Sequence, residues 1–421
     1  MKLLLPFVLA AFGFANLFFR ISSSPVNFTD APPTEFMEDP CDHSMKYNAT
    51  QFSGLVAELD QLTSLTNSMN SERGHAVCPR IFLRKEFRDM SPAEWSRFKR
   101  ALLKMMDGST TPQANTGEDA LPPPTSITFW THLHLASVPH AHGTPQFLPW
   151  HRLFLHKFEL ALRLIDPYVT IPYWDWSLDA PNPASSPIWS LPYLGTVYSE
   201  SGDCINFPVL KSPRPHCLKR RRIFSPQNDQ AGAAPFYSAK TLKAVVEDMS
   251  LTYDRFRALI ELAPHNIVHV AIGGSEGDMS FMSSPNDPIF WLHHTFIDKL
   301  WADHQDLSIA QKGRFSSLTD YNGENPLTQT DVSLSDRLRP FEESVHETMD
   351  YSAPPFCYKY APPRKAVAAS LASKRHLADA IHIQRLPEPI PNSWLRMHRF
   401  NISQVREAET ILAMMMAREA N

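Results

Sequence analysis

Glycine is scarce in this chain, which has 14 glycines and 37 prolines among its 421 residues. Loops that bind phosphate groups use closely spaced glycines so that the backbone can approach the ligand. The shortage therefore argues against a glycine-rich nucleotide site. Proline restricts the backbone and interrupts helices, so its abundance favours long loops between helical segments.

A strong excess of charge is also absent. The chain has 40 lysines and arginines against 44 aspartates and glutamates, a formal net charge of −4. A charge of that size does not attract nucleic acid or an anionic membrane surface. We therefore expect no nucleic acid and no stable membrane partner. The hydrophobic fraction of 43% is sufficient for a sizeable core.

Long apolar runs are missing from all but the first residues. Lys2 precedes an almost unbroken apolar run from Leu3 to Phe19, with small residues at Gly13 and Ala15. This pattern predicts a signal peptide over residues 1–20 and a secreted protein. An uncleaved anchor helix is the alternative, but the run is slightly shorter than the about 20 residues of a membrane span. Export also agrees with three glycosylation sequons, at Asn27, Asn48 and Asn401.

Cysteine is infrequent, and its odd number prevents complete pairing. In an oxidising compartment some of the five cysteines should form disulfides. Cys204 and Cys217 bracket a short polar loop and are the first predicted bridge. Cys41 with Cys78 is the second, which leaves Cys357 as the free thiol.

Helix signals stand at both ends of the chain. Ser91 to Glu94 reads Ser-Pro-Ala-Glu, a capping box that predicts a helix start, and apolar residues follow at helical spacing. A Met- and Ala-rich stretch, Val405 to Ala417, predicts a helix near the C-terminus. Between them, the basic residues Lys219 to Arg222 are expected to lie in a solvated loop.

Histidine is concentrated in two windows, 132–156 and 265–304, which hold 11 of the 18 histidines. In the second window His265 and His269 are four apart, so both project from one helix face and can bind one metal ion. A zinc-peptidase motif would need Glu directly after the first histidine, and Asn266 stands there. His293 and His294 point about 100° apart on a helix, so one of them is expected to face the site.

The first histidine window has the same logic. His151 opens an apolar helical run after Phe-Leu-Pro-Trp, and His142 lies in the loop before it. A third ligand should come from the helix near 127–135, which offers His132 and His134. We favour His134, because its neighbouring residues make an apolar face, and we interpret His156 as a bystander. Three plus three neutral imidazoles, without thiolate or carboxylate, suit copper, zinc or iron. The low charge favours a redox pair that bridges dioxygen over a hydrolytic pair.

The two windows resemble the two copper-site signatures of the tyrosinase family. The stretch from His142 to Glu159 is similar to the first signature, and the stretch from Asp287 to Asp298 is similar to the second. The resemblance covers roughly residues 78–360 and ends with a Tyr-x-Tyr motif. It implies a mainly α fold: a four-helix bundle that holds a binuclear (type 3) copper centre, with long irregular loops and few short strands. Together with the N-terminal apolar run, it divides the chain into a signal peptide (1–20), an N-terminal extension (21–77), the copper-binding catalytic domain (78–360) and a C-terminal tail (361–421).

The resemblance also implies roles for individual residues. Asp298 and Glu159 would support the ligands, with Asp298 accepting a hydrogen bond from the distal N–H of a ligand. Asn266, with Glu261 one turn upstream, would hold a water that deprotonates monophenols. His140 stands where many members have a cysteine in a thioether, so no such crosslink is expected. The implied copper ligands are His134, His142, His151, His265, His269 and His294.

Family members use O2 to hydroxylate monophenols and to oxidise o-diphenols to o-quinones. The resemblance therefore implies a secreted phenol oxidase with two copper ions, acting on small phenols or tyrosine side chains. A catechol oxidase without hydroxylation is one alternative, and a haemocyanin-like oxygen carrier is another. The tail of about sixty residues is shorter than the family's usual shielding domain. It could cover the site or pack on the surface, and we favour the surface.

Overall fold

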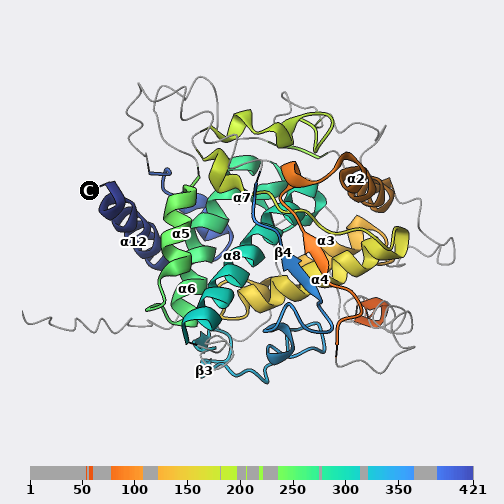
Figure 1. Ribbon diagram of the computed structural model, residues 1–421. Coiled ribbons are helices and arrows are strands. Elements are labelled where there is room, and N and C mark those ends of the chain that lie inside the picture. The colour runs from red at the N-terminus through yellow and green to blue at the C-terminus, as the bar shows by residue number, and fades with distance from the viewer. Residues whose placement is uncertain are drawn as a thin grey trace, which may run out of the picture. The chain divides into compact units, whose positions relative to one another are not determined.

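Four helices form the centre of the fold and carry the histidine windows (Figure 1). They are α3 (Ile127–Ala141), α4 (Phe147–Ile165), α7 (Asn266–Gly273) and α8 (Pro288–Lys312). The computed structural model describes residues 54, 56–59, 77–107, 122–180, 182–196, 205, 218–220, 236–274, 277–312, 321–364 and 386–420. These residues all belong to one compact unit, which spans Met37–Asn421.

Aromatic packing holds three of these helices together. Trp291 of α8 stacks on Phe158 of α4 with ring centroids 3.4 Å apart, and it also stacks on Phe154 at 5.1 Å. Trp130 of α3 meets Phe158 edge-on at 5.5 Å. All four side chains are fully buried. Each large ring buries about 150–250 Å² on folding, so this cluster fixes the spacing of the helices that bear the histidines.

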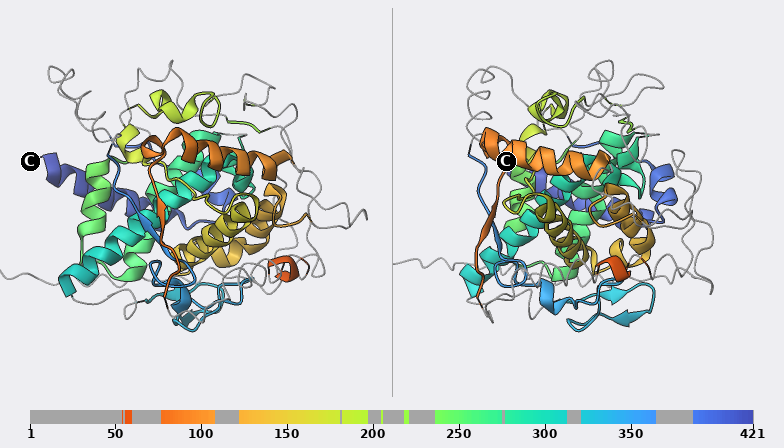
Figure 2. Two further views of the ribbon diagram at one scale, coloured as in Figure 1. Left: turned by 45° about the vertical axis from the view of Figure 1, so that its right-hand side comes forward. Right: turned by 90° about the vertical axis from the view of Figure 1, so that its right-hand side faces the viewer.

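Helix α2 (Pro92–Asp107) begins at the predicted capping box. The Ser91 N–H donates to Glu94 Oε2 at 2.7 Å, and the Glu94 N–H donates to Ser91 Oγ at 3.2 Å. The helix buries its apolar face, including Trp95, Phe98 and Leu102. It lies along α3 and α4, as the two views of Figure 2 show. This prediction from sequence is confirmed.

The helix α8 begins at the Asp-Pro of the second signature. Asp287 Oδ1 accepts from the Ile289 N–H at 3.0 Å, which caps the helix. Both carboxylate oxygens of Asp287 also accept from Arg220, at 2.6 and 2.7 Å. Arg220 is completely buried, so the expectation of a solvated loop was wrong at this residue. Arg220 can be buried because Asp287, which is distant in sequence, compensates its charge.

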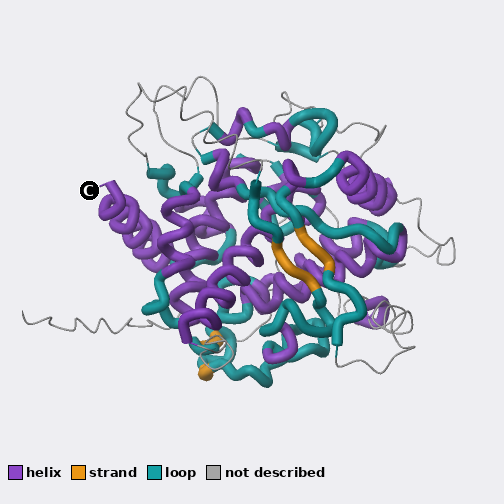
Figure 3. Tube along the Cα trace, viewed as in Figure 1, coloured by secondary structure: helices purple, strands orange, loops and turns teal. Residues whose placement is uncertain are grey.

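Strands are few and short among the described residues (Figure 3). β1 (Phe82–Arg84) pairs in parallel with β4 (Tyr358–Tyr360), with Arg84 opposite Tyr360. β2 (Glu324–Asn325) and β3 (Thr330–Asp331) form an antiparallel hairpin. The mainly α class with few short strands is confirmed. None of the helices in the described ranges is long and apolar enough to cross a membrane.

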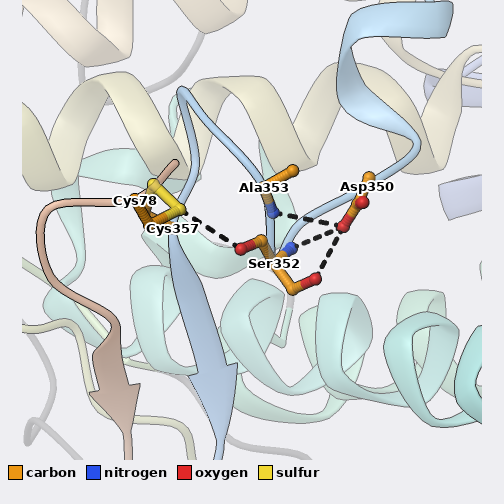
Figure 4. Close-up of a disulfide and its surroundings, with 5 residues drawn as sticks. All are labelled: Cys78, Asp350, Ser352, Ala353 and Cys357. Carbon is orange, nitrogen blue, oxygen red and sulfur yellow. Dashed lines mark hydrogen bonds between the residues drawn. A yellow bond between two sulfur atoms is a disulfide. The ribbon is translucent and has the colours of Figure 1, made fainter. Parts of the chain in front are cut away.

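A disulfide joins Cys78 to Cys357 beside the β1–β4 pair (Figure 4). The Ser352 carbonyl oxygen lies 3.3 Å from Cys78 Sγ. This is a close contact and not a hydrogen bond, because a disulfide sulfur has no proton to donate. The predicted Cys41–Cys78 bridge and the free Cys357 were both wrong. The two partners are 279 residues apart, so no local spacing reveals the pair. Cys41, Cys204 and Cys217 lie outside the described residues.

Shorter helices and the tail complete the unit. α5 (Ala239–Glu247) and α6 (Tyr253–Ile260) precede a π-helical turn at Glu261–His265 that leads into α7. In the tail, α11 (Asn392–Met397) precedes α12 (Ile402–Ala420), which packs on α5, α6 and the π-helical turn. The predicted C-terminal helix is therefore confirmed. Short 3₁₀ turns lie at Phe87–Asp89, Trp176–Asp179, Pro183–Ser185, Pro187–Trp189, Asp278–Ser280, Ser284–Asn286 and His346–Thr348.

Candidate metal centre

Two groups of histidines lie among the central helices, all of them buried except the half-buried His142. The first group is His134, His142 and His151, and the second is His265, His269, His293 and His294. Within each group, one ring nitrogen per residue lies within 4.8 Å of the others. The groups adjoin each other, because the rings of His151 and His294 stack with centroids 4.4 Å apart.

Local backbone features aim the histidines inward. The π-helical turn before α7 contains Pro264, which lacks the N–H of a normal helical turn. The π-helical turn ends at His265, which is the N-cap of α7 and lies one helical turn before His269. His142 follows the last residue of α3 in an extended conformation (φ −129°). Gly143 follows with φ +67°, a left-handed conformation that glycine adopts without strain.

Backbone carbonyls orient three of the rings. Nδ1 lies 2.7 Å from the Met282 carbonyl oxygen in His134, and 2.8 Å from the Met279 carbonyl oxygen in His269. In His151 it lies 2.9 Å from its own helix, at Phe147 O. A carbonyl can only accept, so Nδ1 carries the proton in each ring and Nε2 keeps its lone pair. Nε2 is therefore the nitrogen available to a metal.

The Nε2 atoms of the second group are spaced as metal ligands are. His294 Nε2 lies 3.4 Å from the Nε2 of His265 and 3.4 Å from that of His269. Ligands about 2.0–2.1 Å from one ion lie about 3.3–3.6 Å apart. Nδ1 holds the proton in His269, and in His265 it lies 2.9 Å from Asn266 Oδ1, so the Nε2 atoms of both rings are acceptors. His294 Nε2 has at most one proton and cannot satisfy both of them, whereas one shared metal ion would.

Unpaired buried nitrogens indicate that the first group can also hold a metal ion. Within the part of the chain that the structure describes, Nε2 of His134, Nε2 of His151 and Nδ1 of His142 are buried without a hydrogen-bond partner. Buried polar atoms are nearly always satisfied, because an unmade hydrogen bond costs free energy. A metal ion among these three nitrogens would satisfy them, so this group also fits a bound metal.

His293 differs from its neighbour His294. Sequence reasoning expected only one of the pair to face the site, whereas the structure places both in the second group. The Trp176 Nε1–H lies 3.2 Å from His293 Nδ1, which must accept it. The proton of a neutral His293 ring then lies on Nε2, which cannot bind a metal. The geometry thus supports His294 over His293.

Burial keeps the histidines of both groups neutral. It lowers the pKa of His134 to about 4 and the pKa of His269 to about 3, because the charged ring is disfavoured in an apolar interior. Burial also lowers the pKa of the other members of the two groups, and neighbouring rings lower it further. At neutral pH the rings are therefore unprotonated ligands, as metal binding requires.

Comparison with known proteins agrees with this site. The common central domain of tyrosinase matches residues 124–307. The tyrosinase of Streptomyces glaucescens is 33% identical over 228 residues, which cover 50% of this chain and 78% of that protein. The chain belongs to the tyrosinase family.

Two further relatives set the extent of the likeness. The tyrosinase of Streptomyces antibioticus is 38% identical over 181 residues, or 39% of this chain, but the chain spans only 64% of that relative's length. Among solved structures, a polyphenol oxidase variant from Thermothelomyces thermophila shares the fold, with a TM-score of 0.54 and 20% identity. That match covers 75% of this chain and 99% of the other. The tyrosinase family accounts for the two histidine groups and for the helices that carry them.

The third ligand of the first group was the weakest sequence prediction. The structure places His134 beside His142 and His151, with ring centroids 4.9 and 5.8 Å away, respectively. His132 is not a member of either histidine group in the described part of the chain. His156, interpreted as a bystander, packs against Phe356 at 4.6 Å instead.

Glu261 is completely buried, and its carboxylate has two partners. Oε1 accepts from the Gly143 N–H at 2.6 Å, and Oε2 pairs with Arg257 at 2.8 Å. Burial raises the pKa of Glu261, and Arg257 opposes this rise. Asn266 lines the pocket beside the histidines, and its Oδ1 lies 2.9 Å from His265 Nδ1. Glu261 does not line that pocket.

The carboxylates predicted to support the ligands have other partners. Asp298 accepts from Arg152 Nε at 2.6 Å and from the Tyr358 and Tyr360 hydroxyls. Glu159 pairs with Arg84 at 3.0 Å. The expected hydrogen bond from a ligand to Asp298 is therefore wrong, because Asp298 has stronger charged partners and backbone carbonyls orient the rings. We call this set the ionic cluster: Arg84, Arg152, Glu159, Asp298, Tyr358 and Tyr360.

The C-terminal tail reaches the metal centre, which corrects the expectation that it packs only on the surface. Trp394, His398 and Phe400 line the histidine pocket together with Phe281 and Met282. The space left among the lining side chains holds little more than one water molecule. Sequence reasoning also missed Trp176 and the Met279 and Met282 carbonyls. The aromatic and histidine residues gathered within 394–400 were the only signal for the tail.

Proposed function

We propose that the chain is a secreted type 3 copper oxidoreductase that uses O2 to hydroxylate monophenols and to oxidise o-diphenols to o-quinones. The observation that carries the proposal is in the second histidine group: His294 Nε2 lies 3.4 Å from the Nε2 atoms of both His265 and His269, the spacing of ligands on one ion. Membership of the tyrosinase family supports copper as the metal. The proposed ligands are His134, His142 and His151 for one ion, and His265, His269 and His294 for the other.

The donor set suits redox chemistry. Six neutral nitrogens leave the positive charge of the metals uncompensated, and no carboxylate belongs to either group in the described residues. Two copper ions held by these residues would supply the electrons that reduce dioxygen. The chain's own side chains exclude bulk water, since the proposed ligand rings are buried or nearly so. Backbone carbonyls hold the imidazoles in one tautomer.

The pocket beside the histidines has side chains that suit a phenol ring, but they leave little space between them. Phe281, Trp394 and Phe400 present aromatic surfaces, and Asn266 presents an amide. A phenol can stack on the rings and direct its hydroxyl towards the histidines. Because the remaining space is about that of one water molecule, a phenol can enter only if one of the lining side chains moves. Small phenols are therefore the proposed substrates before tyrosine side chains.

A catechol oxidase without monophenol hydroxylation is the second candidate. One observation favours it: both oxygens of Glu261 are engaged, by Gly143 and Arg257, and Glu261 is not a lining residue. An o-diphenol needs less help with deprotonation than a monophenol does. The role of Asn266 and Glu261 in holding a base remains part of the hydroxylase proposal.

Copper analysis tests the common part of both candidates. The purified full chain should hold two copper ions and oxidise an o-diphenol when O2 is present. One zinc ion with no copper would refute the proposal. Reversible oxygenation without turnover of any o-diphenol would identify an oxygen carrier instead.

Paired substrates separate the two candidates. Asn266→Asp keeps an oxygen that can accept from His265 Nδ1, so it should lower monophenol turnover while o-diphenol turnover remains. Asn286→Asp is a matched control, because Asn286 is also buried and its Oδ1 accepts from Thr131 at 2.7 Å. Wild-type protein that oxidises only the o-diphenol would establish the catechol oxidase.

Secretion is part of the proposal and rests on the N-terminal apolar run and the sequons. The Cys78–Cys357 disulfide is compatible with an oxidising compartment. This bridge joins the ends of the proposed catalytic domain, 78–360. Mass analysis of the secreted chain should show loss of about residues 1–20, whereas an intact N-terminus in the membrane fraction would favour the anchor.

A further inference from the structure

One short loop, Met279 to Met282, contacts a histidine from each group. The Met279 carbonyl accepts from His269 Nδ1 at 2.8 Å, and the Met282 carbonyl accepts from His134 Nδ1 at 2.7 Å. These two histidines belong to different proposed copper sites. The orientation of one ring in each site therefore depends on the position of the same four-residue loop.

The C-terminal tail binds the carbonyl between these two. Ser280 O accepts from Trp394 Nε1 at 3.0 Å and from His398 Nε2 at 2.7 Å. A carbonyl oxygen has two lone pairs, and these two donors use both. The rings of Trp394 and His398 lie 4.0 Å apart, and the ring of Phe400 is nearly parallel to Trp394 at 5.8 Å. The tail thus presents a small packed aromatic unit to the loop.

The other side of the loop rests against the end of α7. Ser280 Oγ donates to the Gly274 carbonyl at 2.6 Å. A Cβ added to Gly273 would lie 2.2 Å from the Ser280 nitrogen, so the backbones touch there. The loop is therefore held between α7 and the tail. Contact with α7 alone fixes one side, and the two donors of the tail fix the other.

The tail is itself anchored away from the loop. Glu407 of α12 pairs with Arg255 of α6 at 2.6 Å, and Glu409 accepts from the Ile390 N–H at 2.9 Å. The side chains of Val405 and Leu412 are fully buried. These contacts hold α12 against α6 and against the segment that precedes α11, so the tail has packing of its own away from the histidine pocket.

We propose that Trp394 and His398 are positioning residues for both copper sites, acting through the Ser280 carbonyl on the Met279 and Met282 carbonyls. This inference rests on the proposed function, because it concerns how the copper pair is held. Loss of the tail's donors lets the loop shift and releases His134 and His269 from their orientation. Partners that orient metal ligands typically contribute about 10- to 100-fold to metal affinity. Both ions should be affected together, although the tail belongs to neither signature.

The test uses Trp394→Phe in the full copper-loaded chain, with Trp189→Phe as the matched control. Phenylalanine keeps an aromatic ring but removes the Nε1–H. Trp189 also donates Nε1–H to a backbone carbonyl, Pro183 O at 2.8 Å, and both tryptophans are 8% exposed. The measurements are the rate of copper transfer to a chelator, the copper content per chain and the optical spectrum of the copper centre.

Trp394→Phe should release both ions about 10- to 100-fold faster and change the spectrum, whereas Trp189→Phe should match wild type. Equal release from Trp394→Phe and wild type would overturn the inference. If Trp394→Phe does not fold, His398→Phe, at a half-buried position, provides the same comparison and can overturn it in the same way. Wild-type chain that binds no copper pair would instead refute the proposed function and leave the positions of these residues as structural facts.

Discussion

Helices α4 and α8 each carry a histidine of the metal centre and, further along, a carboxylate of the ionic cluster. His151 and His294 are neutral, and the first is oriented by a backbone carbonyl. Glu159 and Asp298 are charged and pair with arginines; the Asp298 partner is Arg152 at 2.6 Å. The two regions lie on the same helices but share no hydrogen bond that links a histidine to a carboxylate in the described residues. The comparison teaches that neutral histidines make one region suited to hold a metal ion, while ion pairs in the other region hold the helices together.

Removing a proposed ligand should have the largest effect on copper content and turnover. His294→Ala should lose one copper ion and lower o-diphenol turnover by about a hundredfold or more, beyond the effect of residues that only orient ligands. His293→Ala is the matched control, because its Nδ1 accepts from Trp176 and its Nε2 is protonated. It should keep two copper ions. Loss of copper in His293→Ala with retention in His294→Ala would reverse the assignment.

Breaking the ionic cluster should lower stability and leave copper binding intact. Asp298→Asn leaves the buried Arg152 without its carboxylate and should lower the free energy of unfolding by about 3–5 kcal/mol. The chains that remain folded should still hold two copper ions. Asp303→Asn is the control: it breaks an i,i+4 pair with Lys299 whose carboxylate is 40% exposed, and it should cost no more than about 1 kcal/mol. The measurements are denaturant unfolding and the copper content of each variant. If Asp298→Asn lost copper at unchanged stability, the ionic cluster would not be separate in role from the histidine groups.

Acid should destabilise the two regions of the metal-free protein in different pH ranges. The folded pKa values of His134 and His269 are about 4 and about 3, below the ordinary 6.5, so the unfolded chain takes up protons first as the pH falls. Stability should fall below pH 6.5 by about 1 kcal/mol per pH unit for each such histidine. Arginines lower the pKa of Asp298 and Glu159 against the effect of burial, so their contribution is lost only below their ordinary values of 3.8 and 4.5.

The predicted fall in stability below pH 6.5 is checked by measuring the free energy of unfolding against pH in two variants. Replacing His269 by Gln removes one group that resists protonation, so the slope between pH 6.5 and about 4 should decrease. Asp298→Asn should leave that slope unchanged. A metal-free protein with equal stability at pH 7 and pH 5 would show that the buried histidines do not affect its unfolding.

The smallest effect should come from the loop that carries His142. Gly143 has φ +67°, and an added Cβ would have nothing within 4 Å. Gly143→Ala therefore introduces backbone strain without a clash, about 1–2 kcal/mol. It should speed copper loss from the first site and leave the second site and the ionic cluster intact. Gly143→Asn is the control, since asparagine tolerates this conformation better. Thermal unfolding measures the strain, and stepwise copper release measures the loss from each site. Faster copper loss from the second site would contradict the placement of His142 in the first site.

Local patterns in the sequence predicted the helices and most of the proposed ligands. The Ser91–Glu94 capping box placed the start of α2, and a spacing of four placed His265 and His269 on one face. Both depend on interactions within about one helical turn, which the order of residues determines directly. The choice of His134 over His132 needed the packing of α3 against other elements, so sequence alone left it open.

The sequence by itself determined the mainly helical class and the two histidine windows, because helix periodicity and ligand spacing are local properties. Only the tertiary structure decided which groups support the metal centre. Backbone carbonyls such as Met279 O and Met282 O have no sequence signature, since every residue has one. The Cys78–Cys357 bridge and the contact of Trp394 with Ser280 join residues 279 and 114 positions apart, respectively. Such pairs form only when the helices pack, and for that reason the carboxylates nearest in sequence to the ligands proved to have other partners.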